Sequence, residues 1–169
     1  MHVGIFGRTL CGKTTLGKQL SAAAWRRHPM RLSLVLDPNG EDWGIQATVT
    51  TDMEHFRSKV WASRNCQVFA DEAAMTIARD ADLVDLFTRI RHNGHQFHVL
   101  SHTSASLLPV MREQLSELYL FRQSRHEAEL WAELFMDDGI LAACVLDYEA
   151  HEFLHVRLGG KVKRHVLKL

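Results

Sequence analysis

Residues 7–14, GRTLCGKT, match the glycine-rich pattern of a nucleotide-binding loop and are followed by a second threonine. Glycines at positions 7 and 12 let the chain curl closely enough for its backbone N–H groups to surround phosphates. A lysine at position 13 suits the β- and γ-phosphates, and the hydroxyl of Thr14 suits Mg²⁺, which prefers hard oxygen ligands. We therefore expect an ATP site with Mg²⁺ on Thr14. The expected nucleotide contacts are Gly7, Arg8, Thr9, Leu10, Cys11, Gly12, Lys13, Thr14 and Thr15.

A second chemical signal is the adjacent acid pair Asp71 and Glu72, which follows the apolar segment 66–70. An apolar strand ending in two acids is typical of a Walker B element, in which the aspartate supports Mg²⁺ and the glutamate activates the attacking water. Acids also follow strands simply as helix caps. The nucleotide-binding loop at 7–14, called the phosphate loop below, favours the catalytic interpretation. We expect Asp71 at the metal and Glu72 as the catalytic base.

These residues must be positioned by alternating strands and helices. The patterns predict strands at 3–6, 31–37, 47–51, 66–70, 97–100 and 118–121, and helices at 13–27, 52–64, 80–94, 109–115 and 124–136. The expected helix N-caps are Thr51 or Asp52, Asp80 or Asp82, and Ser124. This alternation predicts an α/β fold, a mainly parallel sheet with helices on both faces. Residues 153–158 and 161–169, joined by two glycines, predict a C-terminal β-hairpin.

Length and charge narrow the possible partners. The chain has 169 residues, which predicts one domain, with an ATPase core at 1–150 and a basic hairpin at 151–169 in the same domain. Twenty basic and twenty acidic residues cancel, so attraction to DNA must be local. Residues 159–169 carry four basic side chains and no acid, and either contact DNA phosphates or protect a solvated edge strand. They are Lys161, Lys163, Arg164 and Lys168.

The three cysteines, Cys11, Cys66 and Cys144, have no metal-like spacing and predict a reducing, cytoplasmic setting. We expect no signal peptide, because the chain runs directly into its first strand, and no apolar run approaches the roughly 18 residues of a membrane span. Cys11 adjoins Lys13 and a helix N-terminus, which both lower a thiol pKa. We therefore expect a reactive Cys11 thiol that ATP protects from alkylation.

Three segments together resemble the FtsK/HerA superfamily of P-loop ATPases, in the viral branch of phage DNA-packaging ATPases and Zot-like morphogenesis proteins. The segments are GRTLCGKTT at 7–15, VFADEA at 68–73 and RIRHNGHQFHVLSHTSASLLP at 89–109. In the third segment an arginine-histidine-x-glycine turn precedes a strand that ends in a polar sensor. The resemblance covers roughly residues 1–136.

The resemblance implies a sheet in which the strand ending at Ser101 lies between the phosphate-loop strand and the Asp71 strand. It implies an ATP-hydrolysing, homo-oligomeric ring, usually a hexamer, that acts on DNA in genome packaging or phage extrusion. An arginine from a neighbouring subunit would complete the site, and Arg91 matches that role best, with Arg89 second. The sensor, commonly glutamine or asparagine, is His102 here, whose neutral imidazole can still donate to a γ-phosphate or position water. The implied partners are DNA and phage capsid or membrane-vertex proteins, in the host cytoplasm or on the virion.

Other interpretations stay open. A small-molecule or nucleotide kinase also has one domain of this size, although a water-activating Glu72 suits hydrolysis better. An ATP-dependent phage assembly factor that moves no DNA is a second alternative. Arg122 and Arg125, like Arg89 and Arg91, either contact phosphate or offset a helix dipole. Four histidines, the sensor among them, share no helical face as a zinc motif requires, which disfavours a metal site. They are His92, His95, His98 and His102.

Overall fold

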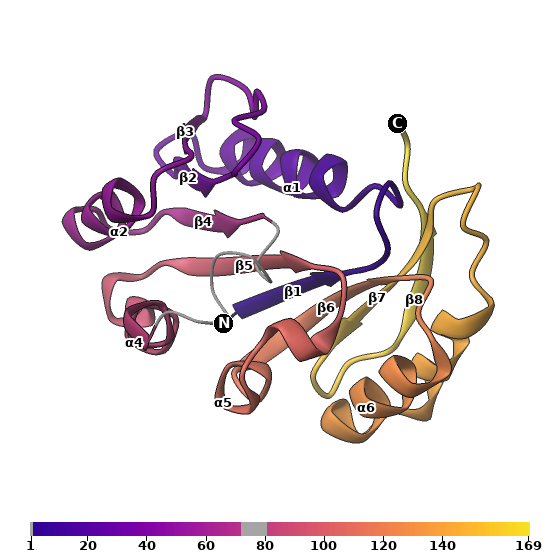
Figure 1. The fold of residues 1–169 in the computed structure, drawn as a ribbon. Coiled ribbons are helices and arrows are strands. Elements are labelled where there is room, and N and C mark those ends of the chain that lie inside the picture. Colours follow the sequence, from indigo (N-terminus) through magenta and orange to yellow (C-terminus); the bar gives the residue numbers. More distant parts are fainter. Residues whose placement is uncertain (1, 72–80) are drawn as a thin grey trace.

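The computed structural model describes residues 2–71 and 81–169, with only the backbone for 81–83. Its strands are β1 His2–Phe6, β2 Ser33–Leu36, β3 Ala47–Thr50, β4 Gln67–Ala70, β5 Gln96–Ser101, β6 Leu115–Phe121, β7 Glu152–Arg157 and β8 Lys163–Val166. They form one sheet in the order β3-β2-β4-β5-β1-β6-β7-β8 (Figure 1). The strands from β3 to β6 in this order are all parallel, β7 pairs antiparallel with β6, and β8 pairs antiparallel with β7. The predicted α/β sheet with its C-terminal hairpin is confirmed.

Helices cover both faces of this sheet, as predicted. They are α1 Lys13–Arg27, α2 Met53–Ala62, α4 Ala81–Arg89, α5 Pro109–Arg112 and α6 Arg125–Phe135, with short 3-10 helices η1 Ile90–Asn93, η2 Ser104–Ser106 and η3 Asp138–Val145. α1 lies on one face, and α4, α5 and α6 lie on the other (Figure 1). Phe56 and Val60 of α2 pack in the same core as Trp131 of α6, whereas Leu16 of α1 packs in a second core. None of the helices in the described residues is long and apolar enough to cross a membrane.

Capping residues predicted from the sequence mark the starts of two helices. Asp52 caps α2 by accepting a hydrogen bond from the backbone N–H of His55 at 2.6 Å, and Ser124 caps α6. The predicted strand at 118–121 was too short: β6 begins at Leu115, because the residues before 118 pair with the start of β1, and α5 is correspondingly one turn. Asp80 and the side chains of Asp82 and Leu83 lie outside the described residues.

Strand order decides which residues meet. β5 lies between β1 and β4, as the resemblance implied, and β6 lies on the other side of β1. Because these four strands are parallel, their carboxyl ends reach the same edge of the sheet. That edge carries the phosphate loop, Asp71, His102 and Arg122. The start of β5, with Arg89 and Arg91 just before it, lies at the opposite edge.

A buried charge cluster surrounds Glu117 of β6, which is 4% exposed. Its carboxylate accepts hydrogen bonds from Tyr119 Oη at 3.0 Å and His155 Nε2 at 2.6 Å, and Arg157 Nε lies 3.3 Å away. Burial by itself would raise the pKa of this carboxyl. The hydrogen bonds from His155 and Tyr119 and the charge of Arg157 outweigh burial and lower the pKa from 4.5 to about 2.

We expect this cluster to make stability depend on acid. A lowered carboxyl pKa stabilises the fold at pH values above the pKa of the same group in the unfolded chain. This contribution to the free energy of unfolding, on the order of 3 kcal/mol, is lost as the pH falls from about 5 to 2. Glu117→Gln should therefore be less stable than the wild type at pH 5, and the gap should close toward pH 2. Urea unfolding at several pH values measures the gap, and a constant gap would contradict the assignment.

Candidate nucleotide site

The phosphate loop connects β1 to α1, and α1 begins in a form suited to an anion. Its N-cap is Gly12, with φ 105° and ψ 12°, and no side chain caps the helix. The first turn contains no acid. The first N–H groups of a helix have no partners within it, and they carry the positive end of its dipole. The start of α1 therefore offers both donors and favourable potential to a phosphate.

Both loop glycines also make room for the protein's own side chains. A Cβ on Gly7 would lie 2.6 Å from Cys11 Sγ and 2.7 Å from Phe121 Cβ. A Cβ on Gly12 would lie 2.5 Å from Leu167 Cδ2. Sequence reasoning assigned these glycines to phosphate approach alone. In the structure, β6 and the C-terminal segment pack against the loop and require them as well.

Lys13 is directed back at the loop from the start of α1, with 7% of its surface exposed. Its Nζ donates to the carbonyl oxygens of Gly7 and Arg8, both at 2.9 Å. His102 directly follows β5, and its Nδ1 lies 3.5 Å from Lys13 Nζ and 3.3 Å from the Gly7 carbonyl oxygen. That nitrogen donates to Gly7 in one tautomer and accepts from Lys13 in the other. The structure thus brings the expected sensor beside the expected phosphate-binding lysine.

Thr14 and Asp71 meet at the same edge, although they are 57 residues apart in the chain. Thr14 Oγ1 donates to Asp71 Oδ2 at 2.7 Å, and Asp71, directly after β4, is buried. A hydroxyl and a carboxylate oxygen side by side fit the ligand preference of Mg²⁺. Glu72, the expected catalytic base, lies outside the described residues.

A cavity of about 410 Å³, here called the loop cavity, opens over these groups. Its lining is Thr9, Leu10, Gly12, Lys13, Thr14, Thr15, Asn39, Glu41, Asp71, His102, His151 and Leu169. The last part of the chain also holds the loop from outside: Tyr148 Oη donates to the Thr9 carbonyl at 2.6 Å, and His151 Nδ1 lies 3.1 Å from the Cys11 carbonyl oxygen. Sequence reasoning missed Tyr148 and His151, because nothing in their local pattern links them to residues 7–14.

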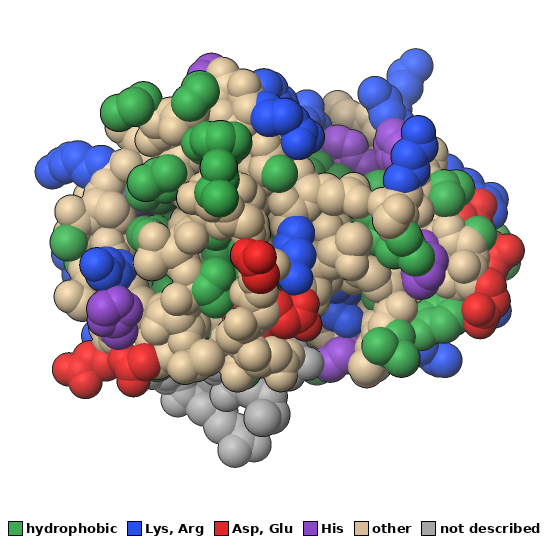
Figure 2. Space-filling model, turned by 90° about the horizontal axis from the view of Figure 1, so that it is seen from above, with side chains coloured by type: hydrophobic (Ala, Val, Ile, Leu, Met, Phe, Trp, Pro, Cys, Tyr) green, Lys and Arg blue, Asp and Glu red, His purple; other side chains and the backbone are tan. Residues whose placement is uncertain are grey.

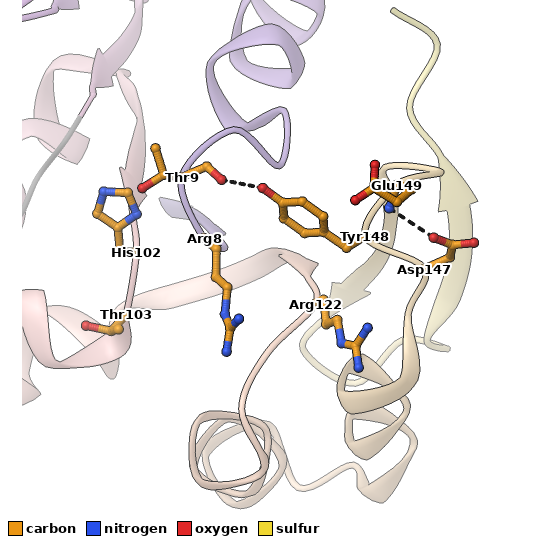
Figure 3. Close-up of a pocket in the computed structure, with 8 residues that line it drawn as sticks. All are labelled: Arg8, Thr9, His102, Thr103, Arg122, Asp147, Tyr148 and Glu149. Atoms are coloured by element: carbon orange, nitrogen blue, oxygen red, sulfur yellow. Dashed lines mark hydrogen bonds between the residues drawn. The ribbon is translucent and has the colours of Figure 1, made fainter.

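A second, larger cavity of about 860 Å³, here called the arginine cavity, adjoins the first (Figure 3). Its lining is Arg8, Thr9, His102, Thr103, Arg122, Asp147, Tyr148 and Glu149. Thr9 and His102 line both cavities, so they mark the boundary between them.

The expectation of a reactive Cys11 is wrong. Cys11 is 2% exposed and packs with Leu16 and Phe121 in the core beneath the loop. Burial raises the pKa of its thiol above the ordinary value, although the nearby charge of Lys13 acts in the opposite direction. Desolvation of the thiolate outweighs both local effects that the sequence suggested.

We therefore expect Cys11 to react slowly with iodoacetamide near neutral pH, with or without ATP. Cys144 is only partly buried and should react at least about tenfold faster, because labelling follows thiolate access. Mass spectrometry of the labelled peptides measures both rates in one sample. Rapid labelling of Cys11 that ATP suppresses would contradict this prediction.

The candidate arginines occupy different places. Arg91 lies in η1 before the six residues of β5, which span about 20 Å, so it lies far from the phosphate loop of the same chain. Arg89 pairs with Asp85 at 3.2 Å. Arg125 pairs with Glu129 at 2.8 Å and lines neither cavity. Among these candidates, the structure brings only Arg122 to the edge that carries the phosphate loop.

The histidines are dispersed. His95 accepts a hydrogen bond from the backbone N–H of Cys66 at 3.0 Å, and its Nε2 lies 3.1 Å from the Val60 carbonyl oxygen. His98 is buried and stacks on Phe69, and burial lowers its pKa from 6.5 to about 4. Among the side chains that the structure describes, no three from His, Cys, Asp or Glu gather as a metal site.

The basic C-terminal residues are exposed. Figure 2 shows Lys, Arg and His side chains gathering at its upper right, on the side of the molecule where β7 and β8 lie. One of the four, Arg164, is paired within the hairpin, with its Nε 3.0 Å from Glu152 Oε1. The backbone carbonyl of Lys168 accepts a hydrogen bond from Gln19 Nε2 at 2.6 Å, which ties the end of the chain to α1.

Solved structures match the chain over almost its whole length. The genome packaging NTPase B204 from Sulfolobus turreted icosahedral virus 2, in complex with sulfate, gives a TM-score of 0.79 at 17% identity, covering 99% of this chain and 96% of that chain. The N-terminal domain of zonular occludens toxin from Neisseria meningitidis gives 0.62 at 15%, covering 99% and 93%. The cytoplasmic domain of the type VII secretion ATPase EccC from Thermomonospora curvata gives 0.67 at 15%, covering 98% and 25%. No family model and no curated protein matches the sequence.

At these identities the similarity concerns the fold. B204 structures also include complexes with AMPPCP, ATP-γ-S and AMP. In this chain, the phosphate loop follows β1, the acid follows β4, and the strand between them ends at the sensor position. The chain therefore shares the P-loop NTPase fold of these proteins, and at the level of fold this agrees with the resemblance inferred from its sequence.

Proposed function

We propose that this chain is an ATP-hydrolysing motor subunit that acts on DNA, in viral genome packaging or in phage extrusion. The observation that carries the proposal is the convergence of Lys13, Thr14 and Asp71 at one edge of the sheet, with Thr14 Oγ1 2.7 Å from Asp71 Oδ2. The whole-chain similarity in fold to the genome packaging NTPase B204 supports the packaging role.

The proposed chemistry divides the work among these residues. Lys13 and the first N–H groups of α1 hold the phosphates, and Thr14 and Asp71 hold Mg²⁺, which offsets phosphate charge when bound. Glu72, directly after Asp71 in the sequence, takes the proton of the attacking water. His102, whose Nδ1 is 3.5 Å from Lys13 Nζ, orients the γ-phosphate or that water.

We further propose a homo-oligomeric ring, with a hexamer favoured, in which Arg91, or else Arg89, reaches the nucleotide of the neighbouring subunit. Both arginines precede β5, at the sheet edge opposite the phosphate loop, so a role in their own subunit's site is disfavoured. An arginine supplied in trans makes turnover per subunit rise with protein concentration.

DNA is the proposed partner of the exposed basic residues Lys161, Lys163, Arg164 and Lys168. Neutralising DNA phosphates releases counterions, so such binding weakens with salt. β7 pairs with β6, which supports placing residues 151–169 in one domain with residues 1–150. The remaining proposed partners are phage capsid or membrane-vertex proteins, met in the host cytoplasm or on the virion.

A nucleotide or small-molecule kinase is the second candidate. The observation in its favour is the arginine cavity, whose 860 Å³ beside the loop cavity is large enough for a phosphate acceptor. An assembly factor that hydrolyses ATP without moving DNA is the third candidate.

ATP turnover with Mg²⁺ distinguishes the three. It should be measured without an acceptor, then with double-stranded DNA at low and high salt, then with candidate nucleosides. We expect turnover without an acceptor, stimulation by DNA, and loss of that stimulation at high salt. Turnover that requires an acceptor would replace the motor with a kinase, and turnover indifferent to DNA would favour the assembly factor.

A further inference from the structure

Two arginines line one cavity at the boundary of the candidate nucleotide site. Arg8 follows Gly7 in the phosphate loop, and Arg122 follows the last residue of β6. β1 and β6 are parallel neighbours, with Phe6 opposite Leu120, so the residues that follow the two strands leave the sheet at the same edge. Figure 3 shows both side chains extending in the same direction, and both line the arginine cavity.

Among the described residues, neither guanidinium group is paired with an acid, although Asp147 and Glu149 line the same cavity. Within residues 2–71 and 81–169, neither guanidinium has a hydrogen-bond or salt-bridge partner. Asp147 lines the same cavity, but its Oδ1 accepts from the backbone N–H groups of Glu149 and Ala150, at 2.9 and 3.2 Å. Like charges that line one cavity repel, and an anion bound between them reduces the repulsion. The cavity is therefore suited to a negatively charged ligand.

The position of the cavity indicates which anion. The loop cavity and the arginine cavity meet at Thr9 and His102. His102 Nδ1 is 3.5 Å from Lys13 Nζ, so a phosphate group held by Lys13 lies at this boundary. A group that extends past Thr9, or leaves in that direction, enters the space that Arg8 and Arg122 line.

We propose that Arg8 and Arg122 form a phosphate subsite beside the phosphate loop. Its ligand is a phosphate group from one of two sources, the terminal phosphate of ATP bound at Lys13 or the inorganic phosphate that hydrolysis releases. Guanidinium groups bind phosphate oxygens through paired, charge-assisted hydrogen bonds, which makes arginine well suited to this role. The subsite rests on the proposed nucleotide binding at the loop, and it does not require that the protein act on DNA.

The test compares Arg122→Gln and the double variant Arg8→Gln/Arg122→Gln with the wild-type protein by calorimetric titration. AMPPCP and ADP are titrated separately, and inorganic phosphate is titrated onto the ADP-bound protein. Each lost charge-assisted contact should weaken phosphate-group binding by about tenfold or more, with ADP affinity within about twofold of the wild type. Arg122→Lys keeps the charge but not the paired hydrogen bonds and should be intermediate.

The arms separate the two sources. A selective loss for AMPPCP assigns the subsite to the terminal phosphate of ATP, and a selective loss for inorganic phosphate assigns it to the product. Arg125→Gln is the matched control, because Arg125 lies three residues further along, is exposed and pairs with Glu129. Unchanged binding of both ligands in the double variant overturns the proposal, as does an equal loss in Arg125→Gln.

Failure of the proposed function gives a different result from failure of the subsite. If the wild-type protein binds neither AMPPCP nor ADP, the nucleotide site is wrong. Inorganic phosphate titrated onto the nucleotide-free protein then still tests Arg8 and Arg122: loss of this binding in the double variant supports the subsite, and unchanged or absent binding overturns it. Because Arg122 is exposed, the thermal unfolding midpoint of Arg122→Gln should match that of the wild type. This match would exclude misfolding as the cause of weaker binding.

Discussion

Lys13→Met should abolish ATP turnover, with kcat/KM falling by about 10³-fold or more. Methionine keeps the unbranched length of the side chain but removes the ammonium group, which lies at 2.9 Å from two loop carbonyls and beside His102. Without that charge, the loop loses its main compensation for the β- and γ-phosphates. Steady-state ATPase kinetics and the affinity for AMPPCP measure the effect, and both should fall.

The matched control is Lys59→Met, the same substitution on the exposed end of α2, far from the loop. Exposed lysines contribute little to stability, so this variant should keep wild-type turnover within about twofold. ATP should raise the unfolding midpoint of the wild type and of Lys59→Met, but not that of Lys13→Met, because a ligand stabilises only the state that binds it. Turnover of Lys13→Met within tenfold of the wild type would contradict the assigned site.

Glu72→Gln should separate binding from hydrolysis. The amide has nearly the size of the carboxylate but cannot accept a proton from the attacking water, so kcat should fall by about 10²- to 10⁴-fold. AMPPCP affinity should stay close to that of the wild type, since Glu72 is not assigned to the phosphates or the metal. Single-turnover ATP hydrolysis together with AMPPCP titration measures the two effects independently.

Asp71→Asn should change the dependence on Mg²⁺, in contrast to Glu72→Gln. Asp71 Oδ2 accepts from Thr14 Oγ1 at 2.7 Å, so loss of its charge should raise the Mg²⁺ concentration that turnover requires. The control Glu54→Gln, in the first turn of α2, should leave both kcat and the required Mg²⁺ concentration unchanged. If Glu72→Gln retains turnover, the catalytic base lies elsewhere, even though the phosphate loop remains assigned.

Much of the architecture was predictable because its signals are local. Glycine spacing, the flanking strand and the following helix all lie within residues 3–27, and each can be inferred from its near neighbours. The capping residues Asp52 and Ser124 were predicted for the same reason. The start of β6 was not, because pairing with β1 recruits residues before 118 that have no strong strand pattern of their own.

Cys11 illustrates where local reasoning failed. The sequence placed a thiol beside a lysine and a helix start, and both features lower a thiol pKa. Burial against residues such as Phe121 raises it instead, and burial depends on segments more than a hundred residues away. Desolvation is a property of the assembled core, so no local pattern reports it.

The sequence by itself determined the chemical groups of the proposed nucleotide site: a lysine, a hydroxyl and an acid pair, at spacings typical of a strand, loop and helix. The tertiary structure alone decided what surrounds that chemistry. It placed Tyr148 on the Thr9 carbonyl across 139 residues, and it brought Arg8 and Arg122, from the ends of β1 and β6, to one cavity. The physical reason is that residue types specify what a group can bind, whereas sheet order specifies which distant groups share the same space.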